Sequence, residues 1–263
     1  MNSLEAKLEA FARLLKIMDE LREQCPWDKK QDFQSLRHLS IEEVYELSEA
    51  ILQEDSQEIK KELGDVLLHI VFYARIASET QTFDIADVIN QLCEKLIRRH
   101  PHIYGDIQAD TEEQVKQNWE QIKQQESKGE KSVLAGVPTS LPALLKAMRM
   151  QEKARAVGFD WEEKAQVWAK VVEEMQEFEA EFNAEQAFDA NKAEQEFGDL
   201  LFSLVNYARF VGINPETALE RTNQKFSKRF QYLEKKAKEL QKSLSEMSLA
   251  EMDIFWNEAK NLA

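Results

Sequence analysis

Apolar residues recur at three- and four-residue steps along almost the whole chain, and the first such series runs from Leu4 to Leu21. This spacing places apolar side chains on one face of a helix and polar side chains on the other. Helices are also expected near 40–53, 55–78, 84–99, 111–126, 141–157, 162–184, 189–211, 215–241 and 248–262. No segment sustains the period-two alternation of a strand, so the pattern predicts an all-α protein.

Capping residues predict where several of these helices begin. An oxygen-bearing side chain at the N-cap accepts a hydrogen bond from a backbone N–H of the first turn, and a Glu or Gln three residues later completes a capping box. The expected caps are Ser40 with Glu43, Asp55, Asp84, Thr111 with Gln114, and Asp160 with Glu163.

An internal repeat organises the chain. Glu42-Glu43-Val44-Tyr45-Glu46 and Glu62-Leu63-Gly64-Asp65 recur as Glu173-Glu174-Met175-Gln176-Glu177 and Glu196-Phe197-Gly198-Asp199, at offsets of 131 and 134 residues. The chain is therefore interpreted as two copies of one helical module, residues 1–127 and 141–263, joined by a linker at 128–140. Because a glycine inside a helix costs about 1 kcal/mol relative to alanine, Gly64 and Gly198 are expected to permit close helix approach.

The repeated carboxylates predict a metal site in each copy. Residues three apart share a helix face, and helices joined by a short connection pack antiparallel. Four carboxylates then meet across one groove, and their repulsion requires protonation or a bound cation. An isolated pair of this kind is normally a solvated face, but its recurrence in both halves favours ligation. Oxygen donors suit Mg²⁺, with Mn²⁺ as an alternative. The expected ligands are Glu43, Glu46, Glu62 and Asp65 in the first copy, and Glu174, Glu177, Glu196 and Asp199 in the second.

The two copies differ beside these carboxylates. Asn206 follows Asp199 by seven residues, where the first copy has Phe72, and Lys192 precedes Glu196 by four, where the first copy has Glu58. Asn206 is either a structural hydrogen-bonding group or a substrate contact. Further along, Lys225 and Arg229 share a helix face. They are either surface charges or cations that neutralise a phosphorylated ligand.

Composition narrows the possible functions. Lys plus Arg number 34 against 49 Asp plus Glu, a net charge of −15, which argues against nucleic-acid binding. No apolar run reaches the roughly 18 residues of a membrane span, and no secretory signal is recognisable at the N-terminus. The two cysteines have no metal-binding spacing, so a cytoplasmic protein is expected. Seven glycines form neither a P-loop nor a Rossmann turn, so any phosphate must be held by other means.

The sequence resembles the MazG family of nucleoside triphosphate pyrophosphohydrolases, in its two-domain bacterial form, over essentially the whole chain. Besides the carboxylate motifs, the resemblance rests on Cys25-Pro26-Trp27-Asp28, Arg98-Arg99-His100-Pro101-His102, Gly136-Val137-Pro138 and Val157-Gly158-Phe159-Asp160-Trp161. It implies tandem four-helix modules of the all-α pyrophosphohydrolase fold and assembly as a homodimer. It also implies Mg²⁺-dependent cleavage of nucleoside triphosphates between the α and β phosphates, with broad specificity and a role in nucleotide-pool housekeeping or regulation.

The resemblance also implies roles for particular residues. The eight carboxylates match the family's Mg²⁺ ligands, and Lys192, Lys225, Arg229 and Trp256 match positions that contact substrate. Trp256 either stacks on the base or caps the core. Glu173, beside the first ligand, either orients the attacking water or faces solvent. A non-catalytic helical adaptor and a ferritin-like oxidase are the alternatives; the oxidase lacks the Glu-x-x-His pairs that di-iron bundles use.

Overall fold

The protein is entirely helical over the residues that its computed structural model describes. These are residues 1–109, 111, 114–115, 118–119, 122, 132–182 and 188–261, and no strand occurs among them. This confirms the all-α prediction. The chain divides into two units, Met1–Trp119 and Glu120–Ala263. The expected domain boundary at 127/128 lies outside the described residues, as does the first part of the linker.

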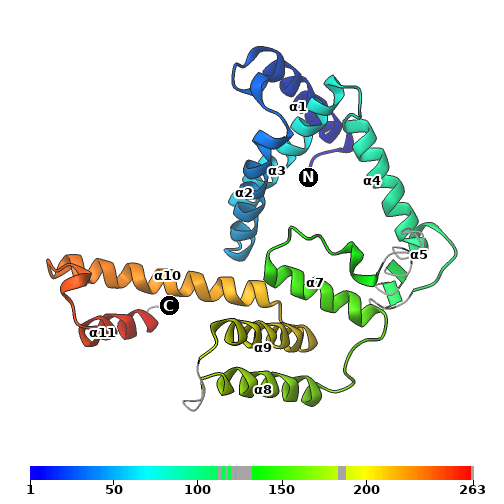
Figure 1. Ribbon diagram of the computed structural model, residues 1–263. Helices are drawn as coiled ribbons and strands as arrows, with labels where there is room; N and C mark the ends of the chain where they lie inside the picture. Colours follow the sequence, from blue (N-terminus) through cyan, green and yellow to red (C-terminus); the bar gives the residue numbers. More distant parts are fainter. Residues whose placement is uncertain are drawn as a thin grey trace. The chain divides into compact units, whose positions relative to one another are not determined.

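Unit 1 is built around a pair of helices that carry its carboxylates (Figure 1). α2 (Phe33–Leu52) and α3 (Ser56–Glu79) pack side by side, and α1 (Leu4–Gln24) lies against α3. The core between them contains Met18, Leu36, Val71, Phe72 and Ile76. The 3₁₀ turn η1 (Asp28–Lys30) connects α1 to α2, and α4 (Ile85–Arg99) and α5 (Pro101–Tyr104) follow α3.

Unit 2 repeats the same order of helices. After η2 (Val133–Gly136) come α7 (Ala143–Ala156), α8 (Lys164–Ala180), α9 (Ala190–Phe210), α10 (Pro215–Glu239), η3 (Leu244–Glu246) and α11 (Leu249–Lys260). α8 and α9 form the central pair and α7 packs on α9, as α1 packs on α3 in unit 1. α10 and α11 enclose a separate cluster around Leu233, Ala237 and Met247. Helices of matching order therefore carry the two copies of the carboxylate motif.

Several of the expected helix starts are confirmed. Asp55 and Asp84 cap α3 and α4, each accepting hydrogen bonds from the first turn of its helix. The Thr111–Gln114 capping box is also present. The backbone N–H of Gln114 donates to Thr111 Oγ1 at 3.2 Å, and the backbone N–H of Thr111 donates to Gln114 Oε1 at 3.3 Å. Most of the helix expected after it lies outside the described residues.

Two of the expected caps are wrong. α2 begins at Phe33 because Asp32 caps it, accepting from the Ser35 N–H at 2.7 Å, so Ser40 lies inside the helix. α8 begins at Lys164, with Glu163 at the N-cap. Asp160 lies upstream of this helix and pairs with a distant arginine instead. At α2 a better-placed aspartate caps the helix, whereas at α8 the Glu163 backbone N–H donates to Gln166 Oε1 at 3.0 Å.

The scarcity of glycine is visible at the helix ends. α2, α3 and α10 are each followed by a residue in the left-handed region, Glu54, Gln81 and Gln241, with φ of 57°, 55° and 56°. Glycine normally occupies such positions because it has no Cβ. No helix in the described part of the chain has both the length and the apolar character needed to span a bilayer.

Candidate active site

Three carboxylates converge in each unit. In unit 2 they come from Glu174 on α8 and from Glu196 and Asp199 on α9. One ligand oxygen from each of the three lies within 4.8 Å of the others. The equivalent group in unit 1, from α2 and α3, is Glu43, Glu62 and Asp65. The predicted juxtaposition across the helix pair is therefore present for these six residues.

Glu46 and Glu177 belong to neither of the groups that meet within 4.8 Å among the described residues. Each projects from the same helix as its unit's first carboxylate, one turn further on. The charges of the group nevertheless affect the pKa of Glu177. Partial desolvation raises its pKa above the ordinary value, and Glu174 raises it further.

The carboxylates are held close together against their own repulsion. The pKa of Glu43 is raised by desolvation and then by Asp65 and Glu46. Glu62 is only 3% exposed, and its Oε2 atom is buried without a hydrogen-bond partner. A buried, unpartnered carboxylate oxygen within an all-oxygen donor set fits a hard divalent cation. The residues present therefore fit the metal site that the repeat predicts.

A lysine contacts each group, which the sequence analysis did not foresee. Lys170 Nζ lies 2.7 Å from Glu174 Oε1 and 2.8 Å from Glu173 Oε1, and both contacts raise its pKa. In unit 1, Lys61 Nζ lies 2.7 Å from Glu62 Oε1. Lys170 precedes Glu174 by four residues on α8, a helical spacing that could have signalled the pair. Each ammonium offsets part of the local negative charge.

The two glycines do not have the role expected of them. A Cβ atom added to Gly64 or Gly198 would meet no atom within 4 Å, so neither glycine permits a close helix contact within its unit. Each precedes its aspartate by one residue and leaves open space there.

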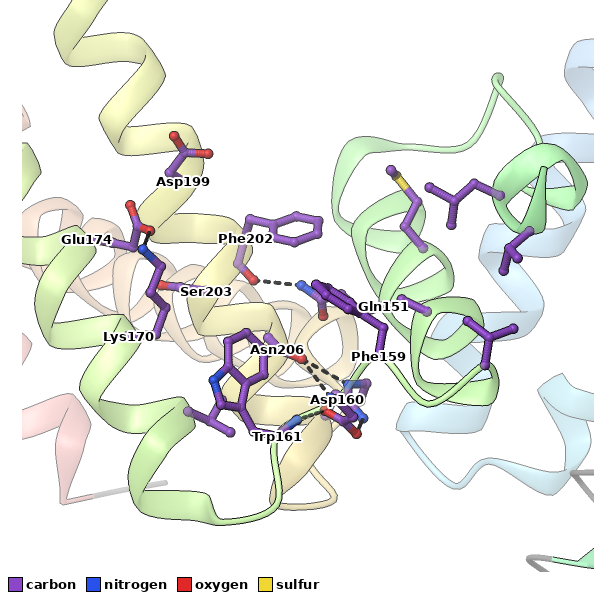
Figure 2. Close-up of a pocket in the computed structure, with 17 residues that line it drawn as sticks. Gln151, Phe159, Asp160, Trp161, Lys170, Glu174, Asp199, Phe202, Ser203 and Asn206 are labelled. Atoms are coloured by element: carbon purple, nitrogen blue, oxygen red, sulfur yellow. Dashed lines mark hydrogen bonds and ion pairs between the residues drawn. The ribbon is translucent and has the colours of Figure 1, made fainter.

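A cavity of about 460 Å³ opens beside the carboxylates of unit 2 (Figure 2). Its walls are largely apolar, and Glu174, Asp199 and Lys170 form part of its lining. Figure 2 shows the carboxylates at one end, with Asn206, Asp160 and Trp161 at the other. Pockets of this size, apolar with a few polar groups, are typical small-molecule sites. The remaining lining residues are Val133, Leu134, Met150, Gln151, Ala154, Val157, Phe159, Val167, Phe202, Ser203 and Arg209.

A polar network forms the far wall of this cavity. Arg209 donates from Nη1 to Asp160 Oδ2 at 3.0 Å and from Nη2 to Asp160 Oδ1 at 2.5 Å. Its Nε and Nη2 also donate to Asn206 Oδ1, at 3.1 and 2.8 Å. Opposite, Gln151 Nε2 donates to the Phe202 carbonyl at 2.8 Å. Asn206 is the member of this network that the comparison of the two repeats predicts, whereas no local pattern identifies Arg209 or Gln151.

Unit 1 has a different interior at the equivalent position. Phe72, which corresponds to Asn206, is 2% exposed and packs in the hydrophobic core. His69, which corresponds to Ser203, belongs to a hydrogen-bonded network with Ser40 and Tyr73. Its Nδ1 lies 3.1 Å from Ser40 Oγ, which is 2.7 Å from Tyr73 Oη. Burial lowers the pKa of His69, although Asp65 opposes this shift.

The remaining predicted site residues of unit 2 lie outside the lining of this cavity. Glu173 is exposed on α8 and pairs with Lys170, and Lys192 pairs with Glu181. Lys225 and Arg229 line a second cavity, of about 330 Å³, on α10.

Trp256 lies beside the second cavity's basic residues. The ring centroids of Trp256 and Phe226 are 5.0 Å apart, and Arg229 Cζ lies 5.9 Å from the Trp256 ring centroid. Arg229 Nε and Gln224 Nε2 are buried donors without partners. Lys225 and Arg229 therefore line a different cavity from that of Glu174 and Asp199.

Comparison with known proteins supplies relatives that span both units. The family profile for the MazG nucleotide pyrophosphohydrolase domain matches residues 31–104. The chain is 44% identical over 253 residues to the nucleoside triphosphate pyrophosphohydrolase/pyrophosphatase MazG of Thermotoga maritima, covering 95% of both chains. It is 41% identical over 254 residues to the nucleoside triphosphate pyrophosphohydrolase of Escherichia coli K12, covering 94% of this chain and 96% of the relative. It is also 49% identical over 253 residues to the uncharacterised protein YabN of Bacillus subtilis, of which it covers 51%.

Proposed function

The chain belongs to the MazG nucleotide pyrophosphohydrolase family, and from this premise we propose that it hydrolyses nucleoside triphosphates to nucleoside monophosphates and pyrophosphate. The observation that carries the proposal is the convergence of Glu174, Glu196 and Asp199 beside an apolar cavity, which Glu174 and Asp199 help to line. A cavity of about 460 Å³ is large enough for a base and sugar, and in this proposal the polyphosphate would extend from it toward the carboxylates.

Mg²⁺ is the proposed cofactor, with Mn²⁺ as an alternative. Glu174, Glu196 and Asp199 would hold it, and Glu177 is the fourth proposed ligand. When bound, the ion offsets phosphate charge and activates water. The chain's own residues supply the rest: Lys170 adds positive charge at the cavity, and Glu173 is the proposed group that orients the attacking water.

Unit 2 is the proposed centre of catalysis. Unit 1 keeps its carboxylates, but Phe72 fills the place of Asn206 with a buried ring. A packed aromatic ring leaves no room for a ligand there, because protein interiors have few voids larger than a water molecule. Unit 1 is therefore proposed as a metal-binding unit of low activity.

A homodimer is the proposed functional state, and exposed apolar positions on the central helix pairs support it. In unit 2, Met175, Phe197 and Leu201 are exposed, and the equivalent Val44 and Leu63 of unit 1 are exposed as well. Apolar faces of this kind typically mark association surfaces.

Association through the unit 2 face gives a second copy the opportunity to bring its basic residues to the carboxylates. In this arrangement Lys192, Lys225 and Arg229 are the proposed phosphate contacts, and Trp256 lies beside them. Replacing Leu201 with Glu should dissociate the dimer in light scattering, whereas Leu4→Glu on α1 should not. A monomeric parent protein would refute the proposed assembly.

The activity is tested by incubating the protein with each of the four NTPs and Mg²⁺ and measuring pyrophosphate and orthophosphate separately. Comparable rates on several bases would support broad specificity, and chelation should abolish them. Orthophosphate alone would refute cleavage between the α and β phosphates. The absence of any product would favour the adaptor.

A matched pair of variants tests which unit is catalytic. Glu196→Gln should lower the rate of pyrophosphate release by at least a hundredfold, because it removes a central ligand, whereas Glu62→Gln at the equivalent position of unit 1 should retain most of it. Mn²⁺ binding monitored by paramagnetic resonance should lose one class of site in each variant. Equal losses of activity would contradict the assignment to unit 2.

A further inference from the structure

The cavity of unit 2 contains a polar feature that phosphate chemistry does not use. Gln151 on α7 lines the cavity, is 7% exposed, and directs Nε2 to the Phe202 carbonyl on α9. Because a carbonyl oxygen can only accept, this bond identifies Nε2 as the atom that faces Phe202 and fixes the orientation of the Gln151 amide. Its Oε1 atom is buried and accepts no hydrogen bond. A buried acceptor without a partner is costly, so the site lacks a donor that a ligand can supply.

Asn206 provides the complementary group. It is also 7% exposed and lines the same cavity, and two guanidinium nitrogens of Arg209 donate to its Oδ1. Arg209 is itself held by the two carboxylate oxygens of Asp160. The guanidinium of Arg209 has only donors, so the oxygen of the Asn206 amide, Oδ1, must face Arg209. The Nδ2 donor of Asn206 is then left for a different partner. The cavity therefore offers one oriented acceptor and one oriented donor between apolar walls.

We infer that Gln151 and Asn206 read the hydrogen-bonding edge of the nucleobase, Gln151 Oε1 accepting from an N–H of the base and Asn206 Nδ2 donating to an adjacent N or O. This rests on the proposed function. Adenine, cytosine, guanine and uracil each carry an N–H beside an acceptor, so the pair accepts all four. It discriminates against a base without an N–H donor. Broad specificity then arises from a defined contact, with Phe159 and Trp161 among the aromatic residues of the wall.

The first copy of the repeat supports this reading by contrast. At the offset that aligns Asp28 with Asp160, Gln151 corresponds to Asp19, whose carboxylate pairs with Arg75 at 2.6 Å. Asn206 corresponds to Phe72, buried in the core. Unit 1 therefore keeps the carboxylates but has neither amide. The inference also assigns Trp256, which packs on Phe226 outside this cavity, to packing rather than to base stacking.

The test compares two uncleavable ligands that differ only at the base. α,β-Methylene-ATP has the N6 amino group, whereas the α,β-methylene triphosphate of purine riboside has none. With Mg²⁺ present, calorimetry on the full-length protein should find the adenine ligand bound about tenfold more tightly, because the purine analogue leaves Gln151 Oε1 unpartnered. Gln151→Met, which keeps the volume but removes the acceptor, should reduce the ratio to about one. Gln176→Leu, on the exposed side of α8, should leave the ratio unchanged.

The possible results distinguish failure of base recognition from failure of the proposed activity. Equal affinity of the parent protein for both ligands would overturn the base-reading inference without requiring any variant to fold, and pyrophosphate release from ATP would then still support the proposed function. An unchanged ratio in a folded Gln151→Met variant would also overturn it. Failure to bind either ligand, together with no pyrophosphate release, would overturn the inference and the proposed function together.

Discussion

Replacing Asp160 with Asn tests whether the network behind the cavity is held by charge. Asp160 and Arg209 have side chains only 17% and 11% exposed, and two hydrogen bonds join them. The substitution keeps the shape and one acceptor oxygen but leaves the guanidinium without its counter-charge. Arg155, whose Nε lies 3.6 Å from Asp160 Oδ2, then adds repulsion.

The expected cost follows from this burial. Removing one partner of a buried ion pair typically costs 3–5 kcal/mol, since an uncompensated charge remains. Because the pair retains some solvent contact and Asn still accepts one hydrogen bond, we expect unit 2 to lose about 3 kcal/mol of unfolding free energy. The Asn206 amide also loses its fixed orientation, so the preference for an N–H-bearing base should weaken in the same variant.

Guanidinium unfolding followed by tryptophan fluorescence is the appropriate assay, since the Trp161 backbone N–H donates to Asp160 Oδ1 at 3.0 Å. The matched control is Glu239→Gln on α10, which breaks a solvent-exposed pair with Lys236 and should cost less than about 1 kcal/mol. If both variants lose the same small amount, the Asp160–Arg209 pair does not hold the cavity wall and the argument from its burial fails.

Three further predictions concern stability. Phe72→Ala should destabilise unit 1 by about 3–5 kcal/mol in denaturant unfolding, while Leu8→Ala at an exposed position of α1 should cost far less; similar costs would contradict the buried position of Phe72. Gln241→Gly should raise the free energy of unfolding by about 1 kcal/mol, because glycine adopts the left-handed conformation of this position without strain. A lower free energy of unfolding would refute strain at Gln241. The hydrogen bond from Arg22 lowers the pKa of Glu79 in the folded protein below its ordinary value of 4.5. The stability that the ionised Glu79 contributes is therefore present above pH 4.5 and is lost as the pH falls through the lowered pKa of the folded state. Parent and Glu79→Gln stabilities should therefore converge on acidification; a difference that persists at low pH would rule out this linkage.

The sequence determined the fold class and the identity of the carboxylates. Apolar periodicity and the lack of strand alternation predict helices, because side-chain spacing along a helix is a local property of the backbone. The repeat predicted eight carboxylates, and six of them meet within 4.8 Å. Glu46 and Glu177 lie outside the two groups, although each follows a member of its group by three residues on the same helix. The sequence also singled out Asn206, which lines the same cavity at the end away from the carboxylates. Local patterns failed at Ser40 and Asp160, because several residues near a helix start can be the N-cap, and these two helices begin after Asp32 and Glu163 instead.

Only the tertiary structure decided which groups are partners. Asp160 and Arg209 are 49 residues apart, and Gln151 and Phe202 are 51 apart; no local spacing connects them. The cavity exists because α7, α8 and α9 leave space there, and its size depends on packing between helices rather than on the pattern within any one of them. The separation of the carboxylates from Lys225 and Arg229 is likewise a matter of helix placement. A periodic sequence specifies which face of a helix is buried, whereas the contacts made by that face depend on the neighbouring helix that packs against it.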